Sequence, residues 1–212
     1  MAGASWNSTN NTLGADLTAL NGQQTLNTAV GGATTADTLQ QLNDFTASGG
    51  SFAPGSTVFL QTGGVDMLNG VDDNTIRNNI NQIVSTLGGY GVNVVLTASP
   101  KAGSINDVVN NNFETGPASF YSDIAANNSN VAVVDSMGNI LKDKSLLRDS
   151  LHTNAAGEQV YNQSVIEAYN RLVNKGVDSN TALTIAKQAT GTTTADASSV
   201  ETPIGVYQLR RR

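Results

Sequence analysis

The chain has 212 residues, no cysteine and a formal net charge of −6, with 13% charged residues. The absence of cysteine excludes disulfides, zinc–thiolate sites and cysteine nucleophiles. The negative balance argues against a nucleic-acid partner, because a phosphate-binding surface is normally basic. No apolar run is long enough to span a membrane, and no signal peptide is visible, so we expect a soluble chain of unassigned compartment.

Predicted strands and helices alternate along the chain. Short apolar runs rich in β-branched residues predict three strands, and a more polar run predicts a weaker fourth one. In chain order, with the weaker one first, they are 24–30, 57–61, 92–98 and 131–135. Apolar residues at helical spacing predict helices over 35–45, 74–87 and 155–173. Asp72 or Asp73 is expected to cap the second of these helices.

The segment after residue 173 differs in composition. A short helix over 178–189 and a Thr/Ala/Ser-rich linker over 191–199 are predicted there, followed over 204–209 by either a short strand or an ordered extension. We therefore expect one domain over 1–173 and a C-terminal extension over 174–212. The basic residues 210–212 are expected to form a solvated tail.

Alternating strands and helices predict a three-layer α/β/α fold with a mostly parallel, doubly wound sheet of four or five strands. Ligand sites in such sheets form at the carboxyl ends of the strands. Three Gly-, Ser- or Thr-containing segments follow predicted strands, at 31–35, 62–66 and 99–101. Glycines there would let backbone N–H groups approach a ligand closely.

His152 is the only histidine of the chain, and Asp149 stands three residues before it. A histidine that acts as a general base needs an acceptor on its other ring nitrogen to fix its tautomer. An Asp at this spacing, on a loop that enters a helix, can supply that acceptor. The alternative is that Asp149 is a solvated loop charge.

The segment Asp149-Ser-Leu-His152 resembles the last conserved block of the SGNH (GDSL-like) hydrolases, D-x-x-H-P, with Thr153 in place of the proline. Upstream, Gly3-Ala-Ser5 resembles the G-D-S block, the segment around Gly32 resembles the second block, and Gly63-Gly-Val-Asp66 resembles G-x-N-D. The four segments occur in the family's order between residue 3 and about 172.

The resemblance implies an SGNH/flavodoxin-like fold and a serine esterase with Ser5 as nucleophile, His152 as base and Asp149 orienting it. It also implies an oxyanion hole built from the backbone N–H groups of Ser5 and Gly32, with no metal or cofactor. The substrate would be a small-molecule ester, a small acyl ester or an acylated carbohydrate; the oligomeric state is not predicted.

Two positions depart from the family pattern. Val65 replaces an asparagine that donates to the oxyanion, and Ala4 replaces the first-block aspartate. In addition, the strand expected before Ser5 is almost absent. Asn7 and Asn69 are candidates for the missing donor.

Two further alternatives concern cations and activity. Asp66, Asp72 and Asp73 could suggest a cation site, but helix capping explains the latter two better. The departures at Val65 and Ala4 leave a second hypothesis open, in which the chain is a catalytically weak or inactive SGNH-like binding or structural module of a larger protein.

Overall fold

The computed structural model describes residues 12–22, 25–101, 106–107, 110, 119–173 and 206–209. The strands follow the predicted order, and three of the predicted helices are present. The helices and strands are α1 (Thr12–Asn21), β1 (Thr25–Asn27), α2 (Thr35–Ala47), β2 (Thr57–Gln61), α3 (Gly64–Leu68), α4 (Asp73–Gly89), β3 (Asn93–Thr97), α6 (Ser119–Asn127), β4 (Val131–Val134), α7 (Met137–Lys142), the 3₁₀ helix η1 (Lys144–Leu146), α8 (Ala155–Val173) and β5 (Val206–Leu209).

The sheet has the order β1-β5-β2-β3-β4. Strands β2, β3 and β4 pair in parallel, whereas β5 pairs antiparallel with both β1 and β2. Four of the five strands therefore run in the same direction, which confirms the predicted mostly parallel sheet. The predicted helix over 178–189 lies outside the described residues, and the domain boundary at 173 stays a prediction.

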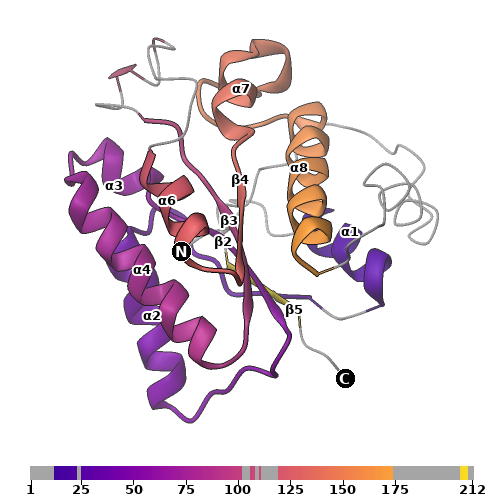
Figure 1. Cartoon of the computed structure of the whole chain (residues 1–212). Coiled ribbons are helices and arrows are strands. Elements are labelled where there is room, and N and C mark those ends of the chain that lie inside the picture. Colours follow the sequence, from indigo (N-terminus) through magenta and orange to yellow (C-terminus); the bar gives the residue numbers. More distant parts are fainter. Residues whose placement is uncertain are drawn as a thin grey trace.

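Helices cover both faces of the sheet (Figure 1). Successive side chains of a strand point to opposite faces, so Val58 and Leu60 of β2 pack under α2, α4 and α6. Phe59, between them, packs with α1, α7 and α8 on the other face. The two apolar clusters and the sheet between them form the expected three layers.

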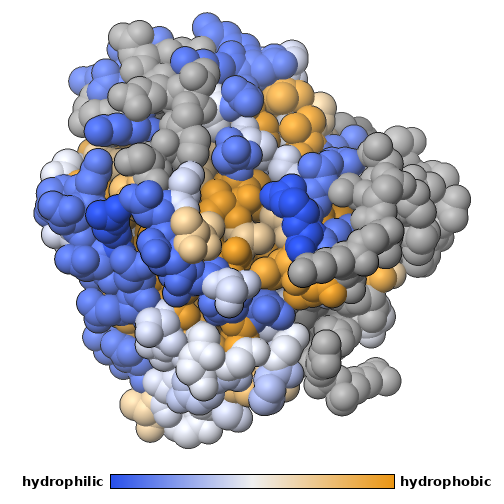
Figure 2. Space-filling model, in the orientation of Figure 1, coloured by the Kyte–Doolittle hydropathy of each residue, from blue (hydrophilic) through white to orange (hydrophobic). Residues whose placement is uncertain are grey.

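Strand β4 is the last in the sheet order, and its middle residues are only partly buried. The guanidinium of Arg171 on α8 donates to the carbonyl of Val133 at 3.3 Å. Figure 2 shows apolar surface in the middle of this face, over the region where β4 lies in Figure 1. Polar and charged residues surround that surface.

The carboxyl ends of the parallel strands lie at one edge of the sheet, where α3 follows β2 and α7 follows β4 (Figure 1). The loop between η1 and α8, which carries His152, lies at this same edge. Candidate functional residues far apart in sequence are thus brought to one end of the molecule.

Candidate active site

A tight loop carries His152 between η1 and α8. Leu147 and Thr153 form an antiparallel bridge, in which Arg148 N–H donates to the His152 carbonyl at 2.8 Å and Asn154 N–H to the Leu146 carbonyl at 2.9 Å. These two hydrogen bonds use the carbonyl of His152 and the N–H of Asn154, not the N–H of Thr153. Thr153 in place of the family's proline therefore leaves the bridge unaffected.

Asn154 joins this loop to the helix that follows. Its side-chain oxygen accepts from the backbone N–H groups of Ala156 and Gly157, at 3.0 and 3.1 Å, which satisfies donors of the first turn of α8. Its side-chain amide donates to the carbonyl of Ser145 at 2.8 Å. The start of α8 and the His152 loop are therefore held together.

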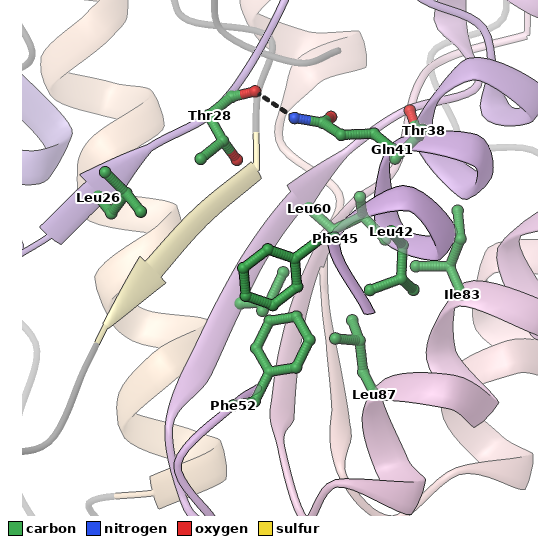
Figure 3. Close-up of a pocket in the computed structure, with 11 residues that line it drawn as sticks. Leu26, Thr28, Thr38, Gln41, Leu42, Phe45, Phe52, Leu60, Ile83 and Leu87 are labelled. Atoms are coloured by element: carbon green, nitrogen blue, oxygen red, sulfur yellow. Dashed lines mark hydrogen bonds between the residues drawn. The ribbon is translucent and has the colours of Figure 1, made fainter. Parts of the chain in front are cut away.

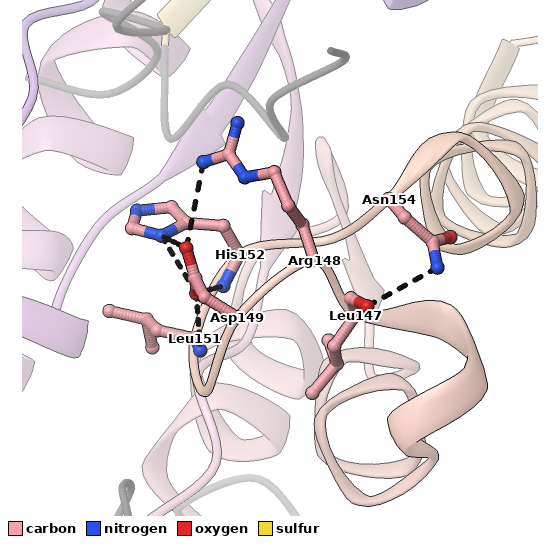
Figure 4. Close-up of polar contacts among 6 residues, drawn as sticks. All are labelled: Leu147, Arg148, Asp149, Leu151, His152 and Asn154. Atoms are coloured by element: carbon pink, nitrogen blue, oxygen red, sulfur yellow. Dashed lines mark hydrogen bonds and ion pairs between the residues drawn. The ribbon is translucent and has the colours of Figure 1, made fainter. Parts of the chain in front are cut away.

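The Asp149 carboxylate lies against the His152 ring (Figure 4). Its two oxygens are 3.0 and 2.9 Å from Nδ1 of His152. The backbone N–H groups of Leu151 and His152 also donate to Asp149, at 2.8 and 2.7 Å. Among the described residues, none hydrogen-bonds to Nε2, and the His152 side chain is 31% exposed. Asp149 thus holds one of the two ring nitrogens, Nδ1.

The surroundings of Asp149 favour its charged form. Partial burial raises the pKa of this carboxyl, but the backbone hydrogen bonds from His152 and Leu151 and the contact with the imidazole outweigh that effect and lower the pKa to about 2. The guanidinium of Arg148 lies 3.6 Å from the same carboxylate. Asp149 is therefore ionised at neutral pH and can stabilise an imidazolium.

The segment that resembles the second family block is a glycine turn after β1. Gly32 has φ of +80°, a conformation that favours glycine, and is exposed. Just beyond it, Thr34 caps α2 with a capping box that includes Asp37. The turn is thus fixed on one side by the start of α2.

Asp66 holds the same end of this turn, at the start of α2. Its buried carboxylate accepts from the backbone N–H of Thr35 at 2.8 Å and from the Thr35 hydroxyl at 2.7 Å. Asn79 of α4 donates to that hydroxyl at 3.0 Å. The start of α2 and helix α3 are therefore tied together across 31 residues of sequence. In the sequence, Asp66 belonged to the third family block and was weighed as a cation ligand, but its bond to Thr35 was not predicted.

The segment that resembles the third family block begins with Gly63, which has φ of +99° and precedes α3. A Cβ at this position would lie 2.4 Å from the Tyr121 hydroxyl, so only glycine fits. That hydroxyl donates to the Thr62 carbonyl at 2.8 Å. Val65 lies half-buried in the first turn of α3, without a side-chain donor, and Asn69 is exposed where α3 ends.

Ser5, Ala4 and Asn7 lie outside the described residues, so the nucleophile stays a prediction. Asp72 caps α4, with its carboxylate accepting from the Thr75 backbone at 3.0 Å. In the part of the chain that the structure describes, no three acidic or histidine side chains gather into a metal-binding group. Over the same residues, none of the helices is long and apolar enough to cross a membrane.

The sequence profile of the GDSL-like lipase/acylhydrolase family matches residues 1–160 of this chain. The chain belongs to the GDSL-like lipase/acylhydrolase family. Membership makes it an ester hydrolase at the level of the family and agrees with the resemblance seen in the sequence. No curated protein sequence matches the chain.

Among solved structures, the chain is similar to the psychrotrophic esterase EstA from Pseudoalteromonas sp., described as inhibited by monoethylphosphonate. The TM-score is 0.53 at 16% identity, over 71% of this chain and 78% of the esterase. At that identity the likeness concerns the fold, which is the α/β arrangement expected for a GDSL-like hydrolase.

Proposed function

We propose that this GDSL-like hydrolase cleaves esters through a Ser-His-Asp triad, with His152 as the general base and Asp149 orienting it. The observation that carries the proposal is the carboxylate of Asp149 on Nδ1 of His152, at 2.9 Å. Such a contact fixes the tautomer in which Nε2 accepts a proton.

The nucleophile in this proposal is Ser5, the serine of the first family block. As its oxygen attacks the ester carbonyl, Nε2 of His152 takes the hydroxyl proton and a tetrahedral intermediate forms. His152 then gives that proton to the leaving alcohol, and the bond between the carbonyl carbon and the alcohol oxygen breaks to leave the acyl-enzyme. Water attacks the acyl group in the same way, which releases the acid and restores the serine.

The oxyanion would be held by the backbone N–H groups of Ser5 and Gly32. Support comes from the Thr35–Asp66 bonds, because they anchor the start of α2, which directly follows the Gly32 turn, to α3. Preorganised donors lose no binding energy to rearrangement during the reaction. The substrates we propose are small acyl esters or acylated carbohydrates.

A second function is favoured by one observation, the absence of a side-chain donor at Val65. Loss of one oxyanion donor typically lowers kcat by a factor on the order of 10²–10³. The chain would then be a catalytically weak or inactive binding module of the same fold.

A phosphonate probe tests the proposal, since phosphonates react with an activated serine and the related esterase is described as inhibited by monoethylphosphonate. Wild-type protein should be labelled once, at Ser5, and His152→Ala should greatly slow the labelling. The tagged peptide is identified by mass spectrometry. Label on another serine would reject Ser5, and no label with no hydrolysis would favour the inactive module.

A further inference from the structure

Side chains from the three segments that follow β1, β2 and β3 lie in one buried polar group, together with side chains of α2 and α6. Its members are Thr35, Thr38, Thr62, Asp66, Ser99 and Tyr121, each at most 8% exposed. Polar side chains buried in this way destabilise the fold unless they have hydrogen-bond partners. Their partners therefore indicate which parts of the active-site edge hold each other in place.

Tyr121 of α6 holds the end of β2. Its hydroxyl donates to the Thr62 carbonyl at 2.8 Å and occupies the space that a Cβ of Gly63 would need. Burial raises the pKa of Tyr121 to about 12, although hydrogen bonds with Ser99, two residues beyond β3, lower it in part. The hydroxyl therefore keeps its proton and remains a donor at neutral pH.

From Thr62, a first route to the Gly32 turn runs through α2. The Thr62 hydroxyl lies 3.2 Å from the Thr38 hydroxyl, which in turn donates to the Thr34 carbonyl at 2.9 Å. Thr34 directly follows the glycine turn and caps α2. The end of β2 is thus connected to the end of the turn by two successive hydrogen bonds between buried or half-buried groups.

A second route runs through α3, which begins two residues after Thr62. Asp66 of that helix accepts from the Thr35 backbone N–H at 2.8 Å, just beyond the same turn. The beginning of the turn is tied to α2, where Gln41 donates to the Thr28 carbonyl at 2.7 Å (Figure 3). Both ends of the turn are therefore held, and its second end is held to the segment that Tyr121 fixes.

We propose that Tyr121 is a positioning residue of this ester hydrolase, which acts through Thr62 to align the backbone N–H of Gly32 with the oxyanion. The inference rests on the function proposed above, in which Gly32 is an oxyanion donor. Tyr121 is fully buried and cannot touch a reactant itself. Its effect comes from geometry, because a shift of about 1 Å in a reacting group can lower the rate about 10²-fold. The alignment of Gly32 matters more in this chain because Val65 supplies no side-chain donor.

Tyr121→Phe removes one hydroxyl and leaves the Thr62 carbonyl without that donor. On nitrophenyl acetate, kcat should fall about ten- to hundredfold while KM changes by less than about twofold, because the oxyanion donor acts mainly on the transition state. Tyr169→Phe is the matched control, since Tyr169 is also buried, at 7% exposed, but packs against Phe59 on the other face of the sheet. It should keep the wild-type kcat.

Amide hydrogen exchange, followed by NMR, tests the same inference without any hydrolysis. The Thr35 N–H is bonded to Asp66, so its exchange should be faster on the order of tenfold in Tyr121→Phe, where the end of β2 is less well held. The N–H of Ile83, within α4, reports a general loss of stability and should change much less. Tyr169→Phe should leave the ratio of the two exchange rates as in the wild type.

The two measurements separate this inference from the proposed function. If the wild type hydrolyses the ester and Tyr121→Phe has the same kcat, the inference is overturned and the esterase stands. If exchange at Thr35 and Ile83 changes alike, the inference is overturned as well, whatever happens to kcat. If the wild type is inactive while Thr35 alone exchanges faster, the proposed function fails and the coupling of Tyr121 to the Gly32 turn stands.

Discussion

At the scale of single residues, the candidate site depends on two aspartates, Asp149 and Asp66, whose carboxylates accept hydrogen bonds from named groups. Asp149 accepts two backbone N–H groups and contacts the imidazole of His152, all within three residues of sequence. Asp66 accepts from the backbone N–H and the hydroxyl of Thr35, which follows the Gly32 turn, across 31 residues. Each aspartate fixes the orientation of a neighbouring group that is proposed to act on the substrate.

Asp149→Asn tests the orienting role and its pH dependence. The amide can offer Nδ1 a hydrogen where an acceptor is needed, so kcat should fall by about 10³–10⁴. The pKa of Asp149 lies at about 2 in the fold against an ordinary value of 3.8. Its stabilisation is therefore complete above about pH 4 and is lost as the pH falls toward 2.

Melting temperatures of the wild type and Asp149→Asn, measured from pH 7 to pH 2, provide the second readout. The difference between them should shrink only below about pH 4. It should be small throughout, because the Asp149 side chain is 45% exposed and solvent screens its charge. An unchanged kcat in the variant would show that Asp149 does not orient the base.

Val65→Asn tests the missing donor. If the new amide reaches the oxyanion, kcat should rise by up to about 10² while KM changes little, because the donor acts mainly on the transition state. Val65→Leu, which adds no donor, is the control and should show no gain. An unchanged or lower kcat in Val65→Asn would mean that another group already fills this role.

At the scale of elements, the sequence predicted best what depends on local pattern. The helix over 155–173 and the strand over 57–61 match their predicted bounds, because periodicity and capping residues lie within each segment. The Asp149–His152 contact was predictable for the same reason. The hydrogen bonds between Thr35 and Asp66 were not predictable, since they join two helices that are far apart in sequence and no local pattern indicates such a pairing.

Among the described residues, four α-helices and the 3₁₀ helix η1 were not predicted, for different reasons. In α1, Leu13, Leu17 and Leu20 stand at helical spacing and pack in the core, so the signal was present. Helix α3 has only 5 residues, α7 only 6 and α6 only 9, which leaves too few turns for a clear period. Their formation depends on packing against the sheet rather than on intrinsic propensity.

Gly157→Ala tests how closely α8 must approach the loop that carries His152. A Cβ there would lie 2.2 Å from the Leu146 carbonyl oxygen, which already accepts from Asn154. Backbone must shift to relieve this overlap, so we expect a loss of about 1–3 kcal/mol in the free energy of unfolding. Urea denaturation measures it.

Gly89→Ala is the matched control, because a Cβ at the end of α4 meets nothing within 4 Å. That variant should be neutral or slightly more stable, since alanine favours helix over glycine. Equal stability of the two variants would contradict the close approach of α8 to Leu146.

At the scale of the whole molecule, the sheet is completed by a segment from the end of the chain. Strand β5 lies between β1 and β2 and pairs with both, whereas the family match ends at residue 160. The sequence left a short strand or an ordered extension open over 204–209, and it predicted neither the neighbours of a strand there nor its direction. Both depend on contacts across more than 140 residues, which local pattern does not encode.

Tyr207→Pro tests this arrangement. The backbone at Tyr207 pairs with Asn27 on one side and Phe59 on the other, and proline removes a donor from that ladder. The melting temperature should fall by several degrees, whereas Tyr207→Val, which keeps the N–H group, should cause a smaller change. A wild-type melting temperature in Tyr207→Pro would show that β5 does not support the sheet.

The central claim is ester hydrolysis with His152 as the general base, and the hydrolysis of nitrophenyl acetate by wild type and His152→Ala tests it most directly. We predict that the wild type is faster by at least about 10³, since base removal abolishes activation of the nucleophile. Equal rates, in variants that melt at the same temperature, would contradict the claim.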